Sequence, residues 1–278
     1  MSAPEPDWRA LNRANWDERV PIHLGPRGYD IASVLNGNAQ LNAIEEAELG
    51  PVAGLRILHL QCHFGRDTLI LVQRGATAVG LDFSVPAIDA ARDLANQVGV
   101  ADRVRFMHAD LYDAVAAIPE PASFDAVFVT WGALPWLPDV AAWARIVAHF
   151  LKPGGWLYLA EGHPAALVLD DETHATHDGN PGFFVPYFHK EPLLLDDAID
   201  YMDRTARLTN AATCQWIHPI GEVVTSLIEA GLHLDWLHEH PCVTWRMFHC
   251  LVEDDAGLYR WPDKPWLPLA YSLHATKP

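Results

Sequence analysis

The chain has 278 residues, half of them apolar and a fifth charged, which is enough for one large domain or one domain with a sizeable insertion. Its formal net charge is −17 and its 19 lysine and arginine residues form no basic patch, which argues against nucleic acid as a partner. The four cysteines form no C-x-x-C pair, Met1–Trp8 lacks the features of a signal peptide, and no apolar run reaches membrane-spanning length. We therefore expect a soluble cytoplasmic protein with reduced thiols and no membrane partner.

Residues 8–50 are predicted to form amphipathic helices, with breaks at Pro21 and at Gly25–Pro26. The loop over residues 20–29 contains more polar and aromatic side chains than simple packing requires. This segment is a candidate for part of a binding site.

The stretch from Ile57 to Ser84 is the most informative part of the chain. An apolar strand (57–60) is followed by a tight turn (61–65), a helix (66–74) and a second apolar strand that ends at Asp82. A strand-turn-helix-strand unit with an acid at the tip of the second strand is how α/β proteins hold the sugar of a nucleoside cofactor.

The alternation of strands and helices continues to residue 161. Strands are predicted over residues 104–108, 124–130 and 156–160, helices over 87–98 and 140–150, and a break over Lys152–Gly155. Such repeated units predict an α/β fold with an open, doubly wound, mostly parallel sheet. Beyond residue 161 the period is lost until a helix over 220–229 and strands over 232–239 and 269–275.

These motifs resemble those of the class I S-adenosylmethionine-dependent methyltransferases. The resemblance rests on the strand and turn Ile57–Gly65, on Asp82, on the pair Asp110–Leu111 and on Lys152–Gly155 before the fifth strand. It covers roughly residues 50–165 and implies a seven-stranded, Rossmann-like sheet whose last strand is antiparallel. It also implies transfer of a methyl group from S-adenosylmethionine to a small-molecule acceptor, with S-adenosylhomocysteine as the product.

The resemblance implies a set of cofactor-binding residues. Asp82 would bind the ribose hydroxyls, Phe83 would pack on the adenine, and Asp110 and Leu111 would bind its polar edge. The turn would wrap the methionine part, and Thr130 would border the sulfonium. The full expected set is Trp16, Tyr29, Gln61, Cys62, Phe64, Gly65, Asp82, Phe83, Asp110, Leu111 and Thr130.

The turn departs from the family pattern in its glycines. His59 stands where an acid is usual, and Gln61 and His63 stand at two glycine positions, so that only Gly65 remains. Glycine in such turns permits positive φ and close approach of a ligand. Two alternatives follow: the turn uses other dihedral angles, or cofactor binding is weakened. The retained Asp82 favours the first.

Methyl transfer needs a base only when the acceptor must lose a proton early. His163, just beyond the fifth strand, is the candidate catalytic base; the structural alternative is a loop histidine bonded to backbone. His174 and His177 have no third ligand at useful spacing, so no metal is expected.

The substrate wall is expected to contain Trp131, Trp136, Tyr187 and His189. Aromatic side chains of this kind suit a planar or cationic ligand. Trp16, Arg19, His23 and Tyr29 would line a lid over the cofactor.

The expected organisation is an N-terminal helical lid (1–50), a cofactor-binding core (51–165), a substrate-side insertion (166–217) and a C-terminal part (218–278) that completes the sheet. The expected assembly is a monomer or a homodimer. Two other functions remain open. A non-catalytic adenosyl-cofactor-binding protein is suggested by the altered turn. An NAD(P)-dependent oxidoreductase would also use Asp82, but it requires a G-x-G-x-x-G turn that is absent here.

Overall fold

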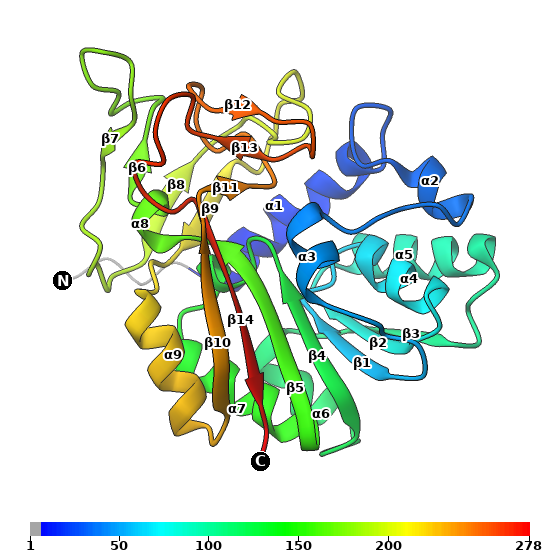
Figure 1. The fold of residues 1–278 in the computed structure, drawn as a ribbon. Coiled ribbons are helices and arrows are strands. Elements are labelled where there is room, and N and C mark those ends of the chain that lie inside the picture. Colours follow the sequence, from blue (N-terminus) through cyan, green and yellow to red (C-terminus); the bar gives the residue numbers. More distant parts are fainter. Residues whose placement is uncertain (1–6) are drawn as a thin grey trace.

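A seven-stranded sheet organises the molecule (Figure 1) in the computed structural model, which describes residues 7–278. Its strands are, in spatial order, β10 (His233–His240), β14 (Ala270–Thr276), β5 (Leu151–Gly162), β4 (Phe124–Thr130), β1 (Arg56–Leu60), β2 (Thr77–Asp82) and β3 (Val104–His108). The five strands β1 to β5 pair in parallel, and β14 is antiparallel to both of its neighbours. The expected doubly wound, mostly parallel, seven-stranded sheet is confirmed.

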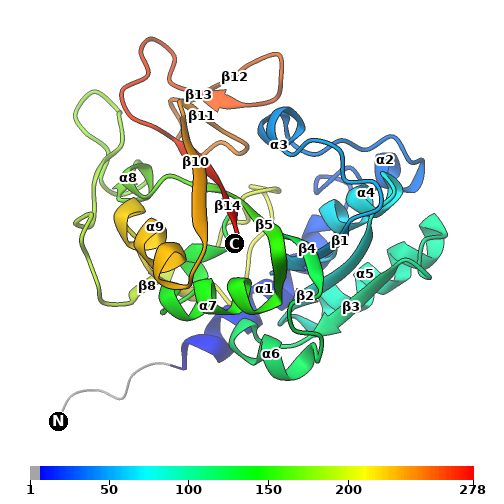
Figure 2. The same ribbon diagram turned by 60° about the horizontal axis from the view of Figure 1, so that its bottom comes forward.

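Helices cover the sheet on both faces (Figure 2). One face packs against α4 (Arg66–Gln73) and α5 (Val85–Val98), and the other against α6 (Ala114–Ala117), α7 (Val140–Phe150) and α9 (Ile220–Glu229). Strand residues alternate between the two cores, since Ile57 packs with the first set of helices and Leu58 with the second. Burial on both faces explains why the central strands are nearly continuous apolar runs.

The N-terminal segment forms α1 (Trp8–His23), α2 (Ile31–Leu35) and α3 (Ala43–Glu48). The expected break at Pro21 is wrong, because α1 continues through it to His23. Pro21 lies in the last turn of the helix, where its missing N–H removes a single hydrogen bond. The expected break at Gly25–Pro26 is confirmed. Residues 1–6 of the expected lid lie outside the described residues.

The segment Lys152–Gly155 was also expected to separate a helix from a strand. Instead β5 begins at Leu151, directly after α7, and includes these residues. The pairing with β4 shifts between Phe124 and Ala126, and Gly154 has a φ of +77°. The four residues therefore form an irregularity inside the strand rather than a loop before it.

Two insertions gather beyond the carboxyl ends of the parallel strands (Figure 1). The first contains α8 (Pro164–Leu167) and the small strands β6 (Leu169–Asp170), β7 (Gly182–Phe183), β8 (Leu193–Asp196) and β9 (Ala212–Gln215). The second separates β10 from β14 and forms its own sheet from β11 (Cys242–Val243), β13 (Tyr259–Arg260) and β12 (Val252–Glu253). The C-terminal part thus does more than complete the main sheet.

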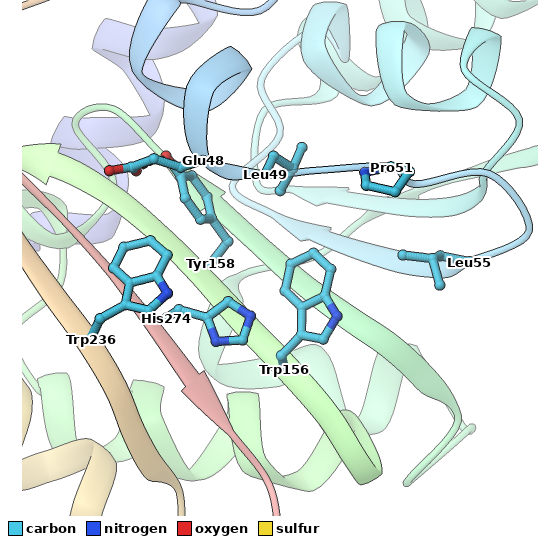
Figure 3. Close-up of a pocket in the computed structure, with 8 residues that line it drawn as sticks. All are labelled: Glu48, Leu49, Pro51, Leu55, Trp156, Tyr158, Trp236 and His274. Carbon is cyan, nitrogen blue, oxygen red and sulfur yellow. Dashed lines mark hydrogen bonds between the residues drawn. The ribbon is translucent and has the colours of Figure 1, made fainter.

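Three aromatic rings lie in a row on β5, β14 and β10 (Figure 3). Trp156, His274 and Trp236 stack with centroid separations of 5.2 and 5.6 Å. Glu48 of α3 faces this row and accepts hydrogen bonds from the Tyr158 hydroxyl of β5 and from Ser272 of β14. Glu48 thereby fixes α3 to the sheet. No helix among residues 7–278 is long and apolar enough to cross a membrane.

Candidate active site

A cavity of about 540 Å³ lies at the carboxyl ends of β1, β2 and β4. The turn after β1, the tips of β2 and β4, and the N-terminal segment form part of its wall. The two insertions complete it, with Leu167, Tyr201, Met202, Gln215, Thr244 and Trp245. Such a cavity at the point where the strand order reverses is where open α/β sheets bind ligands.

The turn after β1 keeps the left-handed backbone that glycine usually supplies. Gln61 has a φ of +55°, His63 of +51° and Gly65 of +76°. The alternative in which the turn adopts other dihedral angles is therefore wrong. A left-handed non-glycine residue costs roughly 1–2 kcal/mol and persists only where its surroundings hold it.

The side chains of Gln61 and His63 provide those surroundings. Gln61 donates from Nε2 to the carbonyl oxygen of Ala133, in the turn after β4, at 2.8 Å. The backbone N–H of His63 donates to Asp82 Oδ2 at 2.8 Å, and its ring Nε2 lies 2.8 Å from His23 Nδ1 of α1. Each residue at a former glycine position therefore connects the turn to a distant segment.

Gly65 is retained for a separate reason. A Cβ atom at this position would lie 2.7 Å from the ring of Phe106, and one at Gly80 would meet the same ring. The ring of Phe106 thus occupies the space beside both glycines. Steric exclusion as well as backbone conformation requires glycine at position 65.

Asp82 lies at the tip of β2 and lines the cavity with only 6% of its surface exposed. Burial raises the pKa of its carboxyl to about 6, although hydrogen bonds from the N–H groups of Ser84, His63 and Phe83 oppose this effect. Ser84 donates to Oδ1 and His63 to Oδ2. A carboxylate has about four acceptor sites, so Asp82 keeps acceptor capacity for a ligand.

The turn after β4 also contains left-handed residues, Trp131 (φ +49°) and Gly132 (φ +77°). The buried carboxylate of Glu161 accepts hydrogen bonds from the N–H groups of Gly132, Ala133 and Leu134, and from that of Gly162. One side chain at the end of β5 thereby fixes the whole turn.

The indole of Trp131 is oriented by Glu45 of α3. Its Nε1–H donates to Glu45 Oε1 at 2.6 Å, and its ring lies 6.1 Å from that of Trp245. Burial raises the pKa of Glu45 to about 8, with the nearby charge of Asp67 acting in the same direction. The neutral acid therefore predominates at pH 7.

A chain of hydrogen bonds leads from the turn after β1 into the first insertion. His23 Nε2 lies 3.1 Å from Asp200 Oδ2, and Arg19 of α1 donates to the same oxygen at 2.8 Å. Burial raises the pKa of Asp200, but hydrogen bonds from His23 and the backbone of Asp203 outweigh it and lower the value to about 2. Asp200 is therefore ionised, and it joins α1 to the 197–203 segment.

Most of the cofactor-binding residues expected from the sequence lie on the cavity wall. Those that line it are Trp16, Tyr29, Gln61, Cys62, Phe64, Asp82, Phe83 and Thr130. Gly65, Asp110 and Leu111 do not. Both carboxylate oxygens of Asp110 have partners, since Arg9 donates to Oδ2 and the N–H of Tyr112 to Oδ1, and Leu111 is buried in the core.

The residues expected to contact substrate divide in the same way. Trp131 and Trp136 line the cavity, whereas Tyr187 and His189 do not. The Tyr187 hydroxyl accepts a hydrogen bond from the N–H of Ile220, and its ring packs beside Val185. The insertion folds back on its own small core here, which carries these two residues away from the cavity.

His163 also lies outside the cavity wall. Its Nδ1 accepts a hydrogen bond from the N–H of Ala165 and so caps α8, while its Nε2 lies 3.0 Å from Glu239. The backbone-bonded alternative describes this arrangement better than a base facing a cleft. Within residues 7–278 no three His, Cys, Asp or Glu side chains are grouped so that they could hold a metal ion.

Several wall residues were not found from the sequence. Thr244 and Trp245 come from the second insertion, whose strands are too short to show a period. Glu161 could have been found from the sequence, because an acid at the end of a buried strand is a typical position for a functional residue. His63 was recognised only as a departure from glycine. Its partner His23, and the Asp200 that pairs with His23, are distant in sequence.

Known proteins share both the sequence and the fold of this region. A family model described as a methyltransferase domain matches residues 57–155. The ubiquinone biosynthesis O-methyltransferase of Paracidovorax citrulli (strain AAC00-1) is 27% identical over 140 residues, covering 49% of this chain and 57% of that protein. Methyltransferase GfsG of Streptomyces halstedii is 33% identical over 170 residues, covering 61% and 59%. The chain thus spans less than two-thirds of the length of these curated relatives.

A crystal structure of an S-adenosylmethionine-dependent methyltransferase from Mesorhizobium loti aligns with 84% of this chain and 96% of its own, at a TM-score of 0.57 and 19% identity. That likeness concerns the fold. Residues 57–155 therefore match a methyltransferase domain, and the chain has the fold of the class I S-adenosylmethionine-dependent methyltransferases.

Proposed function

We propose that this protein transfers a methyl group from S-adenosylmethionine to a small-molecule acceptor. The observation that carries the proposal is the buried carboxylate of Asp82 on the wall of a cavity at the switch point of the sheet. The acceptor capacity that this carboxylate keeps is available to the hydroxyls of a ribose.

The residues present fit the adenosyl cofactor. Asp82 would hold the ribose, Phe83 would pack against the adenine, and Thr130 would border the reacting centre. Gln61 Oε1 is buried without a hydrogen-bond partner among the described residues, which suits a donor supplied by a ligand. The cofactor, when bound, supplies a methyl carbon activated by a sulfonium sulfur.

The protein's own contribution is to bind, orient and exclude water. The rings of Trp131, Trp136 and Trp245 would hold the acceptor against the cofactor, and the two insertions would shield it from solvent. Cys62 and Phe64 would support the turn, and Trp16 and Tyr29 of the N-terminal segment would cover the site. These roles, and the division into lid (1–50), core (51–165), insertion (166–217) and C-terminal part (218–278), belong to the proposal.

The wall also favours a class of acceptor. Arg66 is the one cationic side chain of the described cavity wall, and it pairs with Asp67 at 2.6 Å. Aromatic rings and carboxylates form much of the remaining wall. A neutral or cationic, partly planar small molecule fits this surface better than a phosphorylated one or a nucleic acid. We further propose a cytoplasmic location, which the four free cysteines support, and a monomer or homodimer.

Isothermal titration calorimetry with S-adenosylmethionine, S-adenosylhomocysteine and NAD⁺ tests the proposal. We expect both adenosyl compounds to bind and NAD⁺ not to bind.

Asp82→Ala should weaken S-adenosylhomocysteine binding by at least about 100-fold, because two hydrogen bonds to a charged acceptor are lost at roughly 1.5–3 kcal/mol each. Binding of NAD⁺ alone would refute the proposal. Cofactor binding without S-adenosylhomocysteine formation across a panel of metabolites would favour a non-catalytic binder.

A further inference from the structure

The two histidines between Asp200 and the cavity differ in exposure. His23 is completely buried, whereas His63 is half-buried and lines the cavity. The ring of His63 is surrounded by Trp16, His23 and Phe64, with centroid separations of 5.2, 5.0 and 4.6 Å. Its Nε2 faces His23. Its Nδ1 has no hydrogen-bond partner among residues 7–278 and is not one of the enclosed polar atoms. This nitrogen is therefore accessible, on a residue that lines the cavity.

The protons along this chain can be assigned from its ends. Asp200 Oδ2 can only accept, so His23 must carry a hydrogen on Nε2. The Nδ1 of a neutral His23 is then an acceptor, and it must receive its hydrogen bond from the Nε2–H of His63. A neutral His63 with its hydrogen on Nε2 has a lone pair on Nδ1. The ionised carboxylate of Asp200 thus sets the tautomer of His23, and His23 in turn sets that of His63. As a result, His63 Nδ1 is a hydrogen-bond acceptor.

The surrounding charges support a neutral His63. Burial lowers the pKa of His63 well below its usual value, and the positive charge of Arg19 acts in the same direction. Asp200 opposes them. Arg19 shares the carboxylate of Asp200 and so compensates most of its charge.

The location of His63 indicates which part of a bound cofactor would donate a hydrogen bond to the lone pair on Nδ1. Its backbone N–H donates to Asp82, the acid assigned to the ribose, so its ring stands beside the sugar and the methionine part of a cofactor held there. Both parts carry hydrogen-bond donors, as ribose hydroxyls and as an α-ammonium group.

We propose that the Asp200–His23–His63 chain is a cofactor-recognition element in which His63 Nδ1 accepts a hydrogen bond from an O–H or N–H donor of the adenosyl cofactor. His63 is the binding residue, and His23 and Asp200 position it and set its tautomer. This inference rests on the proposed function. In this arrangement the replacement of glycine at position 63 adds a contact to the cofactor.

The variant His63→Gly distinguishes two explanations of His63, because they predict opposite changes in the affinity for S-adenosylhomocysteine. It restores the residue usual in the family, and glycine tolerates a φ of +51°. If His63 only obstructs the turn, S-adenosylhomocysteine will bind as tightly to His63→Gly as to the unmodified protein, or more tightly. If His63 accepts a hydrogen bond, binding will weaken by about 5- to 15-fold. Equal or tighter binding overturns the proposal.

A second ligand identifies the donor. 5′-Methylthioadenosine keeps the ribose but lacks the amino-acid part. Weaker binding of both ligands to His63→Gly assigns the donor to the ribose, and weaker binding of S-adenosylhomocysteine alone assigns it to the ammonium group. The matched control is His274→Gln, which breaks the 2.7 Å pair of His274 with Asp235 on the sheet face of Figure 3, outside the cavity. It should leave both affinities within about twofold.

The tautomers provide a readout that a structural role would not change. Long-range ¹H–¹⁵N spectra of the histidine side chains should show His63 and His23 as Nε2–H tautomers in the ligand-free protein. Asp200→Asn presents an N–H to His23, which reverses both tautomers, places a hydrogen on His63 Nδ1 and weakens S-adenosylhomocysteine binding while the imidazole remains. A Nδ1–H tautomer of His63 in the unmodified protein overturns the inference. Failure of the unmodified protein to bind any adenosyl compound overturns the proposed function instead.

Discussion

The turn after β1 and the turn after β4 both contain non-glycine residues with positive φ, and different contacts stabilise each turn. Both leave a parallel strand at the cavity and both place bulky residues in the left-handed region: Gln61 and His63 in the first, and Trp131 in the second. In the first turn each strained residue is held by its own side chain, which bonds a different distant segment. In the second, one buried carboxylate, that of Glu161, holds three consecutive N–H groups.

Because the two turns are held in different ways, we expect substitutions in the second turn to change mainly stability. We expect substitutions in the first turn to change mainly ligand binding. Three consecutive backbone N–H groups of the second turn depend on the single carboxylate of Glu161, so its loss should cost the fold a great deal. The first turn distributes its support, so single replacements there should cost less and act mainly on the ligand.

Glu161→Ala should have the largest effect on stability. It removes the acceptor of four buried N–H groups, each bond contributing about 1–1.5 kcal/mol, so the free energy of unfolding should fall by about 5 kcal/mol. Urea denaturation measures it. Glu161→Gln keeps one carbonyl oxygen and should lose about half as much. A loss below about 1 kcal/mol for the alanine variant would show that the second turn has other support.

Glu45, which orients Trp131 in the second turn, should make stability depend on pH. Its folded pKa of about 8 lies above the unfolded value of 4.5, so the folded state holds a proton that the unfolded state has lost. Stability therefore falls as pH rises through this window, by about 4 kcal/mol between pH 5 and pH 9. Glu45→Gln should remove this dependence in denaturation curves. The same slope in both proteins would assign it to other groups.

Gly65→Ala and Gln61→Gly form a matched pair in the first turn. The alanine would be left-handed and would press its Cβ against the ring of Phe106, so we expect a loss of about 3 kcal/mol. Gln61→Gly relieves strain but loses the bond to Ala133 and gains unfolded-state entropy, so its net change should stay within about 1 kcal/mol. Thermal and urea unfolding compare them. Equal losses would contradict the distinct roles of the two positions.

Asp82 should make ligand affinity depend on pH, by a smaller free energy than the losses expected for Glu161, Glu45 and Gly65→Ala. Its pKa of about 6 means that the carboxyl takes up a proton as pH falls, and the protonated acid is a poorer acceptor for hydroxyl groups. S-adenosylhomocysteine should bind about tenfold more weakly at pH 5 than at pH 7, a change of about 1.4 kcal/mol. Calorimetry at several pH values measures this. Asp82→Asn should bind weakly without this pH dependence.

The sequence predicted the elements with strong periodicity well. The observed bounds of β3, β4, α7 and α9 agree with the expected ones to the residue, because their buried faces are continuous and their ends carry Asp, Pro or Gly signals. The short strands of residues 241–269 gave no such pattern, so the part of the cavity wall around Trp245 was missed.

The candidate site was predictable only where one residue carries the chemistry. Asp82 was found from its place at the end of a strand. The hydrogen bonds from His63 to His23 and from His23 to Asp200 join residues 40 and 177 positions apart, which no local pattern reports. The left-handed Gln61 and His63 contradict their local preference, and tertiary hydrogen bonds explain why.

The strand β10 has a consequence for how these molecules meet one another. It forms one border of the main sheet, and its pairing with β14 is interrupted between Leu234 and Trp236. Its exposed residues include Asp235, Glu239 and two histidines, His233 and His238. Charges and a broken ladder discourage a neighbouring chain from adding a strand there. This edge of the sheet is therefore unsuited to the addition of a strand from a neighbouring molecule.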